Sequence, residues 1–154
     1  MDKKRVLIDT NVVLDFLLKR ANYEIAFEII NLAVNNEVIE FLTATTITDI
    51  NFLSMKYSNP KMDSYTVQEK IKDLLKIIDI LPVLKSDIEK ALELHWLDME
   101  DALQYSVALT NKCDCIVTNN TKDFEKAEIE VLNPYDFINK YFKELDNDEY
   151  DYEK

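Results

Sequence analysis

The feature that most constrains this chain is an alternation between short, β-branched apolar runs and longer segments with helical periodicity. Parallel strands need long crossover connections, which are usually helical, so this order predicts an α/β fold. We expect a three-layer α/β/α sandwich around a mainly parallel sheet of about five strands. The expected strands span residues 5–8, 38–42, 80–83, 115–118 and 129–132, and the expected helices span residues 12–17, 23–33, 45–57, 64–78, 86–94 and 98–109, with a last helix from Pro134.

One domain accounts for most of the chain. The length of 154 residues suits a single compact unit, which we place at residues 1–143. Residues 144–154 are mostly acidic and polar, and we expect a flexible tail there. No apolar run approaches the ~18 residues that span a bilayer, so we expect a cytoplasmic protein with no membrane partner.

The composition excludes several kinds of site. The chain has no glycine, so it lacks the phosphate loops of Rossmann dinucleotide-binding proteins and P-loop NTPases. A single histidine, His95, cannot provide the two histidines of an HExxH site. We expect His95 to pack or to lie at the surface, which argues against a Ser-His-Asp site as well. Cys113 and Cys115 are expected to be buried thiols on one face of a strand, because they lie two residues apart in an apolar stretch.

Aspartates gather where the carboxyl ends of the predicted strands should meet. Asp9 directly follows the first strand, and Asp123 lies shortly after a later one. Asp49 and Asp101 fall near the starts of helices at the same edge, and Asp98 precedes Asp101 by three residues. Ligands bind at this edge of open parallel sheets, and clustered carboxylates favour hard cations such as Mg²⁺ or Mn²⁺. The sequence therefore predicts a pocket for a divalent metal.

Helix capping is an alternative explanation for several of these acids, because an acid at the third helical position satisfies free N–H groups and favours the helix dipole. Asp9 is different, since a carboxylate at the end of a buried strand needs partners. Asp15, six residues later, is expected to be a surface acid. Three pairs match the capping pattern: Thr46 with Asp49, Asp98 with Asp101, and Asn120 with Asp123.

Four motifs, in order, resemble those of PIN-domain nucleases, including VapC-type toxins of toxin–antitoxin systems. They are LIDTN at residues 7–11, TATTITDI at 43–50, DMEDALQ at 98–104 and TNNTKDF at 118–124. The segment LNPYDF at 132–137 resembles the one that usually follows. The resemblance implies that Asp9, Asp49, Asp101 and Asp123 are catalytic acids and metal ligands, that Asp98 is an accessory ligand, and that Thr10, Asn11 and Asn120 orient the metal or contact substrate.

The same resemblance implies a Mg²⁺- or Mn²⁺-dependent endoribonuclease that hydrolyses RNA phosphodiester bonds and serves as the toxin of a toxin–antitoxin pair. The implied partners are an RNA substrate, a cognate antitoxin and a second copy of the chain. A net charge of -12 opposes RNA binding through a basic surface, although cations bound in an acidic pocket can offset it. Four scattered cations are candidates for contacts with the RNA backbone, although we expect most of them to be solvated: Lys19, Arg20, Lys56 and Lys122.

Two positions depart from the family's pattern. Asp49 stands where the acid is usually the longer glutamate, and Asn119 stands where members often carry an arginine that can contact phosphate. These departures favour an alternative, a PIN-fold interaction module that binds a partner and cleaves weakly or not at all. A phospho-acceptor receiver domain fits less well, because the pair of acids near the first strand is missing. A haloacid-dehalogenase-like phosphatase would need an acid at Asn11.

Overall fold

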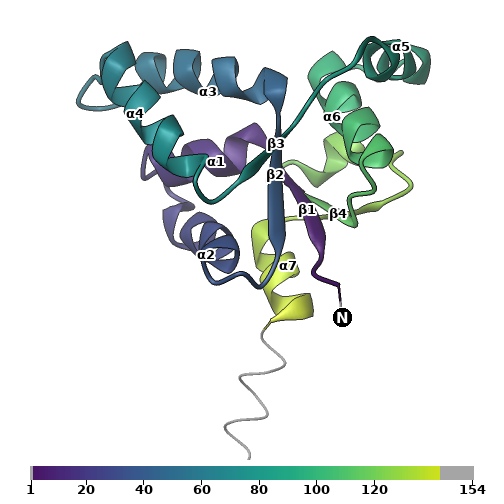
Figure 1. Ribbon diagram of the computed structural model, residues 1–154, viewed down its shortest axis with the longest axis horizontal. Helices are drawn as coiled ribbons and strands as arrows, with labels where there is room; N and C mark the ends of the chain where they lie inside the picture. The colour runs from purple at the N-terminus through teal and green to yellow at the C-terminus, as the bar shows by residue number, and fades with distance from the viewer. Residues whose placement is uncertain (1, 143–154) are drawn as a thin grey trace, which may run out of the picture.

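The computed structural model describes residues 2–142, and it confirms the three-layer α/β/α sandwich (Figure 1). All neighbouring strands are parallel, in the order β3-β2-β1-β4-β5. The predicted acidic tail at residues 144–154 lies outside the described residues. The strands are β1 (Arg5–Ile8), β2 (Ile39–Thr43), β3 (Asp79–Leu81), β4 (Cys115–Val117) and β5 (Glu130–Leu132).

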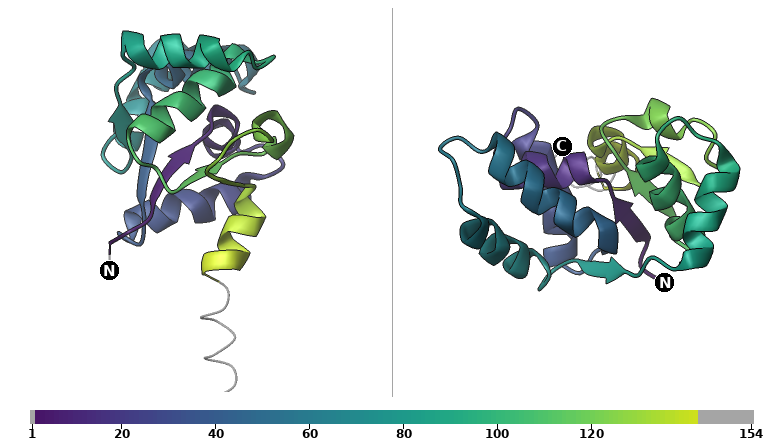
Figure 2. Two further views of the ribbon diagram at one scale, coloured as in Figure 1. Left: turned by 90° about the vertical axis from the view of Figure 1, so that its right-hand side faces the viewer. Right: turned by 90° about the horizontal axis from the view of Figure 1, so that it is seen from above.

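Helices cover both faces of this sheet (Figure 2). One face is packed by α1 (Thr10–Leu17), α2 (Tyr23–Val34), α3 (Ala44–Tyr57), α4 (Ser64–Leu74) and α7 (Pro134–Tyr141). The opposite face is packed by α5 (Lys85–Leu94), α6 (Met99–Thr110) and the short 3₁₀ helix η1 (Thr121–Phe124).

The central strand β1 shows why two cores form. Val6 and Ile8 point into the cluster under α1 and α2, whereas Leu7 points into the cluster under α6. All three side chains are at most 1% exposed, which is the pattern of a parallel strand covered on both faces. No helix within residues 2–142 is long and apolar enough to cross a membrane.

Two local predictions were wrong. The helix expected over residues 64–78 ends at Leu74, because the chain turns there and carries the buried Ile78 into the core before β3 begins. Cys113 and Cys115 are both buried free thiols, but they pack into opposite cores, because β4 begins only at Cys115. Burial raises the pKa of Cys113 to about 11 and that of Cys115 to about 12.

Candidate active site

A cavity of about 270 Å³ lies where β1 and β4 end, and we call it the acidic cavity. The two strands pair in register, with Ile8 opposite Val117, so the residues that follow them emerge side by side. The first turn of α6 supplies further acids to the same place. The polar side chains that line the acidic cavity are Asp9, Thr10, Asn11, Arg20, Tyr57, Asp98, Glu100, Asp101, Asn120 and Asp123.

Asp9 is the most firmly held of these acids. It is 5% exposed, and it is also the N-cap residue of α1, where its Oδ1 accepts a 2.7 Å hydrogen bond from the Thr10 backbone N–H. Oδ1 also accepts from Gln104 Nε2 at 3.0 Å, and Oδ2 accepts from Asn11 Nδ2 at 3.1 Å and from Thr118 Oγ1 at 2.7 Å. Four donors from three segments therefore fix the carboxylate and offset the cost of burying it.

The first turn of α6 carries three acids into the acidic cavity. Asp98 is the N-cap residue, and its Oδ1 accepts a 3.1 Å hydrogen bond from the Asp101 backbone N–H. Asp101 is 8% exposed, whereas Asp98 and Glu100 are exposed. Thr10 Oγ1 approaches Glu100 Oε1 at 3.4 Å and so links the first turns of α1 and α6.

Crowding of these carboxylates changes their acidity. Burial, followed by the charges of Asp9 and Asp98, raises the pKa of Asp101 to about 7. Removal from water, followed by the charge of Asp49, raises the pKa of Glu100 to about 7. Negative charge is therefore unfavourable in this cavity without a compensating cation, and carboxylate oxygens are the donors that Mg²⁺ and Mn²⁺ prefer.

Carboxylate oxygens suit a divalent cation, but the acidic side chains are not arranged as a complete set of ligands around one point. Within residues 2–142, no group of three or more His, Cys, Asp or Glu side chains is arranged so that it could hold a metal ion. The acids surround one cavity rather than one point. An ion at this site would therefore need water ligands or a rotation of the exposed carboxylates of Asp98, Glu100 and Asp123.

Most residues predicted for the site line the acidic cavity, and Asp49 is the exception. Asp9, Asp98, Asp101 and Asp123 line it, together with the predicted accessory residues Thr10, Asn11 and Asn120. Asp49 is not part of the lining. It lies beside Glu100, whose pKa it raises through its charge and through a side-chain hydrogen bond.

The capping alternative holds for one of the three pairs. Asp98 caps Asp101 as the spacing predicts. The prediction that Thr46 is an N-cap residue with Asp49 at the third helical position was wrong, because α3 begins earlier, at Ala44, with Thr43 as its N-cap residue. Asn120 precedes η1, but its side chain makes no capping hydrogen bond with the turn that holds Asp123.

Three residues of the site were missed by sequence reasoning. Gln104 donates to Asp9 and lies three residues after Asp101, so the shared helix face was a usable signal. Thr118 donates to Asp9 and directly follows β4, which places it at the expected edge. Glu100 lies between the predicted positions Asp98 and Asp101, and it also lines the cavity.

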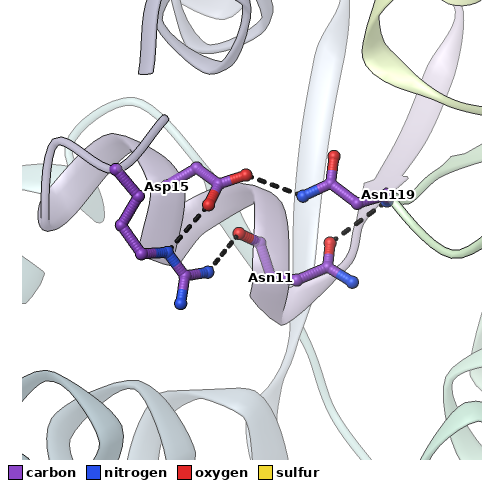
Figure 3. A network of polar contacts seen from close by, with 4 residues as sticks. Asn11, Asp15 and Asn119 are labelled. Carbon is purple, nitrogen blue, oxygen red and sulfur yellow. Dashed lines mark hydrogen bonds and ion pairs between the residues drawn. The ribbon is translucent and has the colours of Figure 1, made fainter. Parts of the chain in front are cut away.

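Asp15 was expected at the surface, and this was wrong, because it is 5% exposed. Figure 3 shows its polar contacts with neighbouring residues. Its Oδ1 accepts a 2.8 Å hydrogen bond from Arg20 Nε, and its Oδ2 accepts a 2.7 Å hydrogen bond from Asn119 Nδ2. Asn119 N in turn donates to Asn11 Oδ1 at 3.2 Å. The segment after β4 and the turn after α1 therefore cover this face of α1.

His95 lies at the surface, in agreement with its predicted role. It ends α5 in the left-handed region, with φ of 55°. It lines a neighbouring cavity of about 530 Å³ together with Trp96, Lys122 and Lys126. Asp98 and Asp123 line this cavity as well as the acidic cavity, so the two adjoin.

Comparison with known proteins places the chain in a family. A sequence model described as the PIN domain matches residues 5–122. The chain is 30% identical to Ribonuclease VapC1 of Aquifex aeolicus (strain VF5) over 147 residues, which are 92% of this chain and 98% of that protein.

Solved structures share the fold. One is a DNA-bound VapBC from Salmonella typhimurium, with a TM-score of 0.65, 14% identity and coverage of 85% of this chain and 98% of that chain. Another is a toxin–antitoxin complex from Klebsiella pneumoniae, with a TM-score of 0.63, 21% identity and coverage of 84% of this chain and 98% of that chain. The match to the PIN-domain model and the 30% identity to the Aquifex aeolicus protein show that the chain belongs to the PIN-domain family.

Proposed function

We propose that this protein is a divalent-metal-dependent endoribonuclease and that the acidic cavity is its active site. The observation that carries the proposal is the convergence of exposed and buried acids around Asp9, a buried carboxylate held by four hydrogen bonds. The ribonuclease activity named for its relative in Aquifex aeolicus supports RNA as the substrate. Mg²⁺ or Mn²⁺ is the proposed cofactor.

Asp9, Asp101 and Asp123 are the proposed principal ligands of the ion, with Asp98 as an accessory ligand. Asp49, although predicted as a fourth acid, is proposed to act through Glu100, because it lies beside that side chain rather than in the cavity lining. When bound, the ion supplies a Lewis acid for the scissile phosphate and lowers the pKa of a water molecule.

Polar neighbours keep these acids in place. Gln104 and Thr118 orient the carboxylate of Asp9, and Asn11 both donates to Asp9 and accepts from the Asn119 backbone N–H. We propose that Asn120, exposed at the cavity wall, contacts the substrate. Thr10 sets the spacing between Asp9 and Glu100 through its backbone N–H and its hydroxyl.

We also propose that the protein is the toxin of a toxin–antitoxin pair, works as a homodimer and binds a cognate antitoxin. The similar fold of the Klebsiella pneumoniae toxin–antitoxin complex supports this proposal. Control by a partner also suits an enzyme whose unregulated activity would destroy RNA.

Cleavage of a mixed RNA pool tests the nuclease. The wild type is incubated with Mg²⁺, with Mn²⁺ or with EDTA beside Asp101→Asn. A matched control is Asp73→Asn, which changes the charge equally at an exposed position of α4. We expect cleavage that requires the metal, is lost in Asp101→Asn and is retained in Asp73→Asn. Equal cleavage by all three proteins, or none by the wild type, would overturn the proposal.

A second candidate is a PIN-fold interaction module that cleaves weakly or not at all. Two observations favour it: Asp49 does not reach the cavity, and no preformed metal-binding group exists within residues 2–142. Absence of cleavage in the wild type, with dimerisation and binding of an antitoxin peptide intact, would support the module. Metal-dependent cleavage that Asp9→Asn abolishes would exclude it.

A further inference from the structure

We propose that Arg20 is a phosphate-binding residue of the acidic cavity and holds the RNA backbone beside the carboxylates. This inference rests on the proposed ribonuclease function and extends it to substrate recognition. A cavity lined by acids repels a phosphodiester, so substrate binding needs positive charge in addition to a bound ion. Among residues 2–142, Arg20 is the one Lys or Arg that lines this cavity.

The guanidinium of Arg20 is held on one side by the protein. Its Nε donates to Asp15 Oδ1 at 2.8 Å, and its Nη2 donates to the backbone carbonyl oxygen of Asn11 at 3.2 Å (Figure 3). Asp15 is itself fixed by Asn119 Nδ2 at 2.7 Å. These contacts join α1, the turn after α1 and the segment after β4, so they preset the position of the guanidinium at the cavity wall.

The other side of the guanidinium is available to a ligand. The Arg20 side chain is 39% exposed, whereas the side chain of its partner Asp15 is 7% exposed. Within residues 2–142, Nη1 makes no hydrogen bond, and Nη2 retains a second N–H. The buried carboxylate therefore anchors the arginine from behind, and the free N–H groups suit two oxygens of one phosphate.

The neighbouring cations do not share this position. Lys19 precedes Arg20, is exposed and does not line the acidic cavity. Lys122 lines the adjoining cavity instead. Arg20 thus combines a cationic group, a fixed orientation and a place beside Asp9 and Asp101, which a solvated surface lysine lacks.

Steady-state cleavage of a single-stranded RNA with Mn²⁺ tests the role of Arg20 through Arg20→Gln, with Lys19→Gln as a control that removes the same charge one residue away. We expect Arg20→Gln to raise KM about 10-fold or more with a smaller effect on kcat, because a contact with bound substrate is lost. The slope of log affinity against log salt should fall by about 0.7, as for the loss of one phosphate contact on a single strand. Lys19→Gln should leave both quantities unchanged.

A double variant separates binding from folding. Arg20→Gln alone leaves Asp15 buried without its cation, so the variant could lose activity through local distortion. Asp15→Asn combined with Arg20→Gln removes both charges and the uncompensated carboxylate. The RNA affinity of the double variant should remain as low as that of Arg20→Gln. Restoration of wild-type affinity and salt slope in the double variant would overturn the proposal and leave a structural ion pair.

Binding of the same RNA with Ca²⁺ in place of Mn²⁺, measured by fluorescence anisotropy, distinguishes this inference from the proposed function. If the wild type cleaves RNA but Arg20→Gln matches Lys19→Gln in KM and salt slope, the inference fails and the nuclease stands. If the wild type binds RNA through Arg20 without cleaving it, the nuclease fails and the phosphate site stands. If it neither binds nor cleaves RNA, both fail.

Discussion

The buried carboxyl groups of Asp9 and Glu40 differ in their hydrogen bonding. Asp9 accepts four hydrogen bonds and faces the acidic cavity. Glu40 lies in β2, is 2% exposed, and its buried Oε1 has no hydrogen-bond partner. Burial alone raises the pKa of Glu40 well above 4.5, so this group prefers to be neutral in the folded protein. The hydrogen bonds to Asp9 therefore offset the cost of burying its charge, whereas the burial of Glu40 lowers the stability of the fold at neutral pH.

Glu40→Gln should stabilise the protein at neutral pH and flatten its stability profile. In the wild type the folded-state pKa is raised, so between pH 4.5 and that raised value the unfolded chain releases a proton that the folded chain keeps. Unfolding free energy should therefore fall as the pH rises through this window and level off above it. Glu40→Gln, measured by urea denaturation from pH 4 to 8, should have a shallower slope than the wild type, to which Asp101 and Glu100 still contribute, whereas the exposed neighbour variant Glu37→Gln should keep the full slope. The same slope in both variants would contradict the assignment.

Gln104→Met should lower kcat by about 10-fold with little change in KM. Gln104 donates one of the four hydrogen bonds to Asp9, and loss of a hydrogen bond to a charged group costs about 1.5–3 kcal/mol. Methionine has a similar shape, and it also removes the buried Oε1 that has no partner, so folding should be preserved. Steady-state kinetics with the Mn²⁺ enzyme, together with the melting temperature, check this. A fall in kcat that accompanies an equal loss of folded protein would argue against a positioning role.

At the scale of elements, the site is built from the junctions between strands and helices. Asp9 directly follows β1 and caps α1 through its side chain, with no loop between the two elements. Thr43 ends β2 and is the N-cap residue of α3, again with no loop, although its side chain makes no capping hydrogen bond. Asp98 caps α6, which turns Asp101 toward Asp9. Short connections of this kind hold the acids on regular structure, which fixes them better than a long loop would.

Helix α7 has an N-cap that can be altered without changing a residue of the site. Asn133 Oδ1 accepts from the Asp136 backbone N–H at 2.8 Å, and α7 buries Phe137 in the core. Asn133→Ala should therefore lower the unfolding free energy by about 1 kcal/mol in denaturant titrations. Asn133→Ser, which keeps a capping oxygen, should lie close to the wild type. Equal losses in the two variants would show that the cap does not stabilise α7.

At the scale of the whole molecule, the sheet order brings together acids that are distant in the sequence. The central pair β1 and β4 sets Asp9 beside the segment that carries Asp123. Helix α6 packs on one face of the sheet and brings Asp101 to the same cavity. Repulsion among these carboxylates adds to the effect of a net charge of -12, which itself disfavours a compact chain. Cation binding should therefore stabilise the entire fold.

Mn²⁺ should raise the melting temperature of the wild type. An ion present at 100 times its dissociation constant contributes about 2.7 kcal/mol, which corresponds to roughly 5–10 °C for a chain of this size. Asp101→Asn should melt higher than the wild type without metal, because repulsion is relieved, and should gain less from Mn²⁺. Differential scanning fluorimetry with NaCl at matched ionic strength as the control measures both effects. An equal gain in the two proteins would place the ion outside the acidic cavity.

Much of the arrangement followed from the sequence alone. The alternation of apolar runs and helical patterns determined the α/β/α architecture, since each pattern reports which local structure can bury its apolar side chains. The placement of Asp9, Asp101 and Asp123 around one cavity also followed, because parallel strands direct their carboxyl ends to the same edge.

Only the tertiary structure decided which polar side chains meet there. Asp15 is buried because a distant segment with Asn119 and the turn with Arg20 close over it, and no local pattern encodes that contact. Glu100 rather than Asp49 lines the cavity, because the rotation of α6 and α3 about their axes depends on how both pack against the sheet. Local periodicity fixes which face of a helix is apolar. The direction of each polar side chain at a helix end is set by contacts between segments far apart in the sequence.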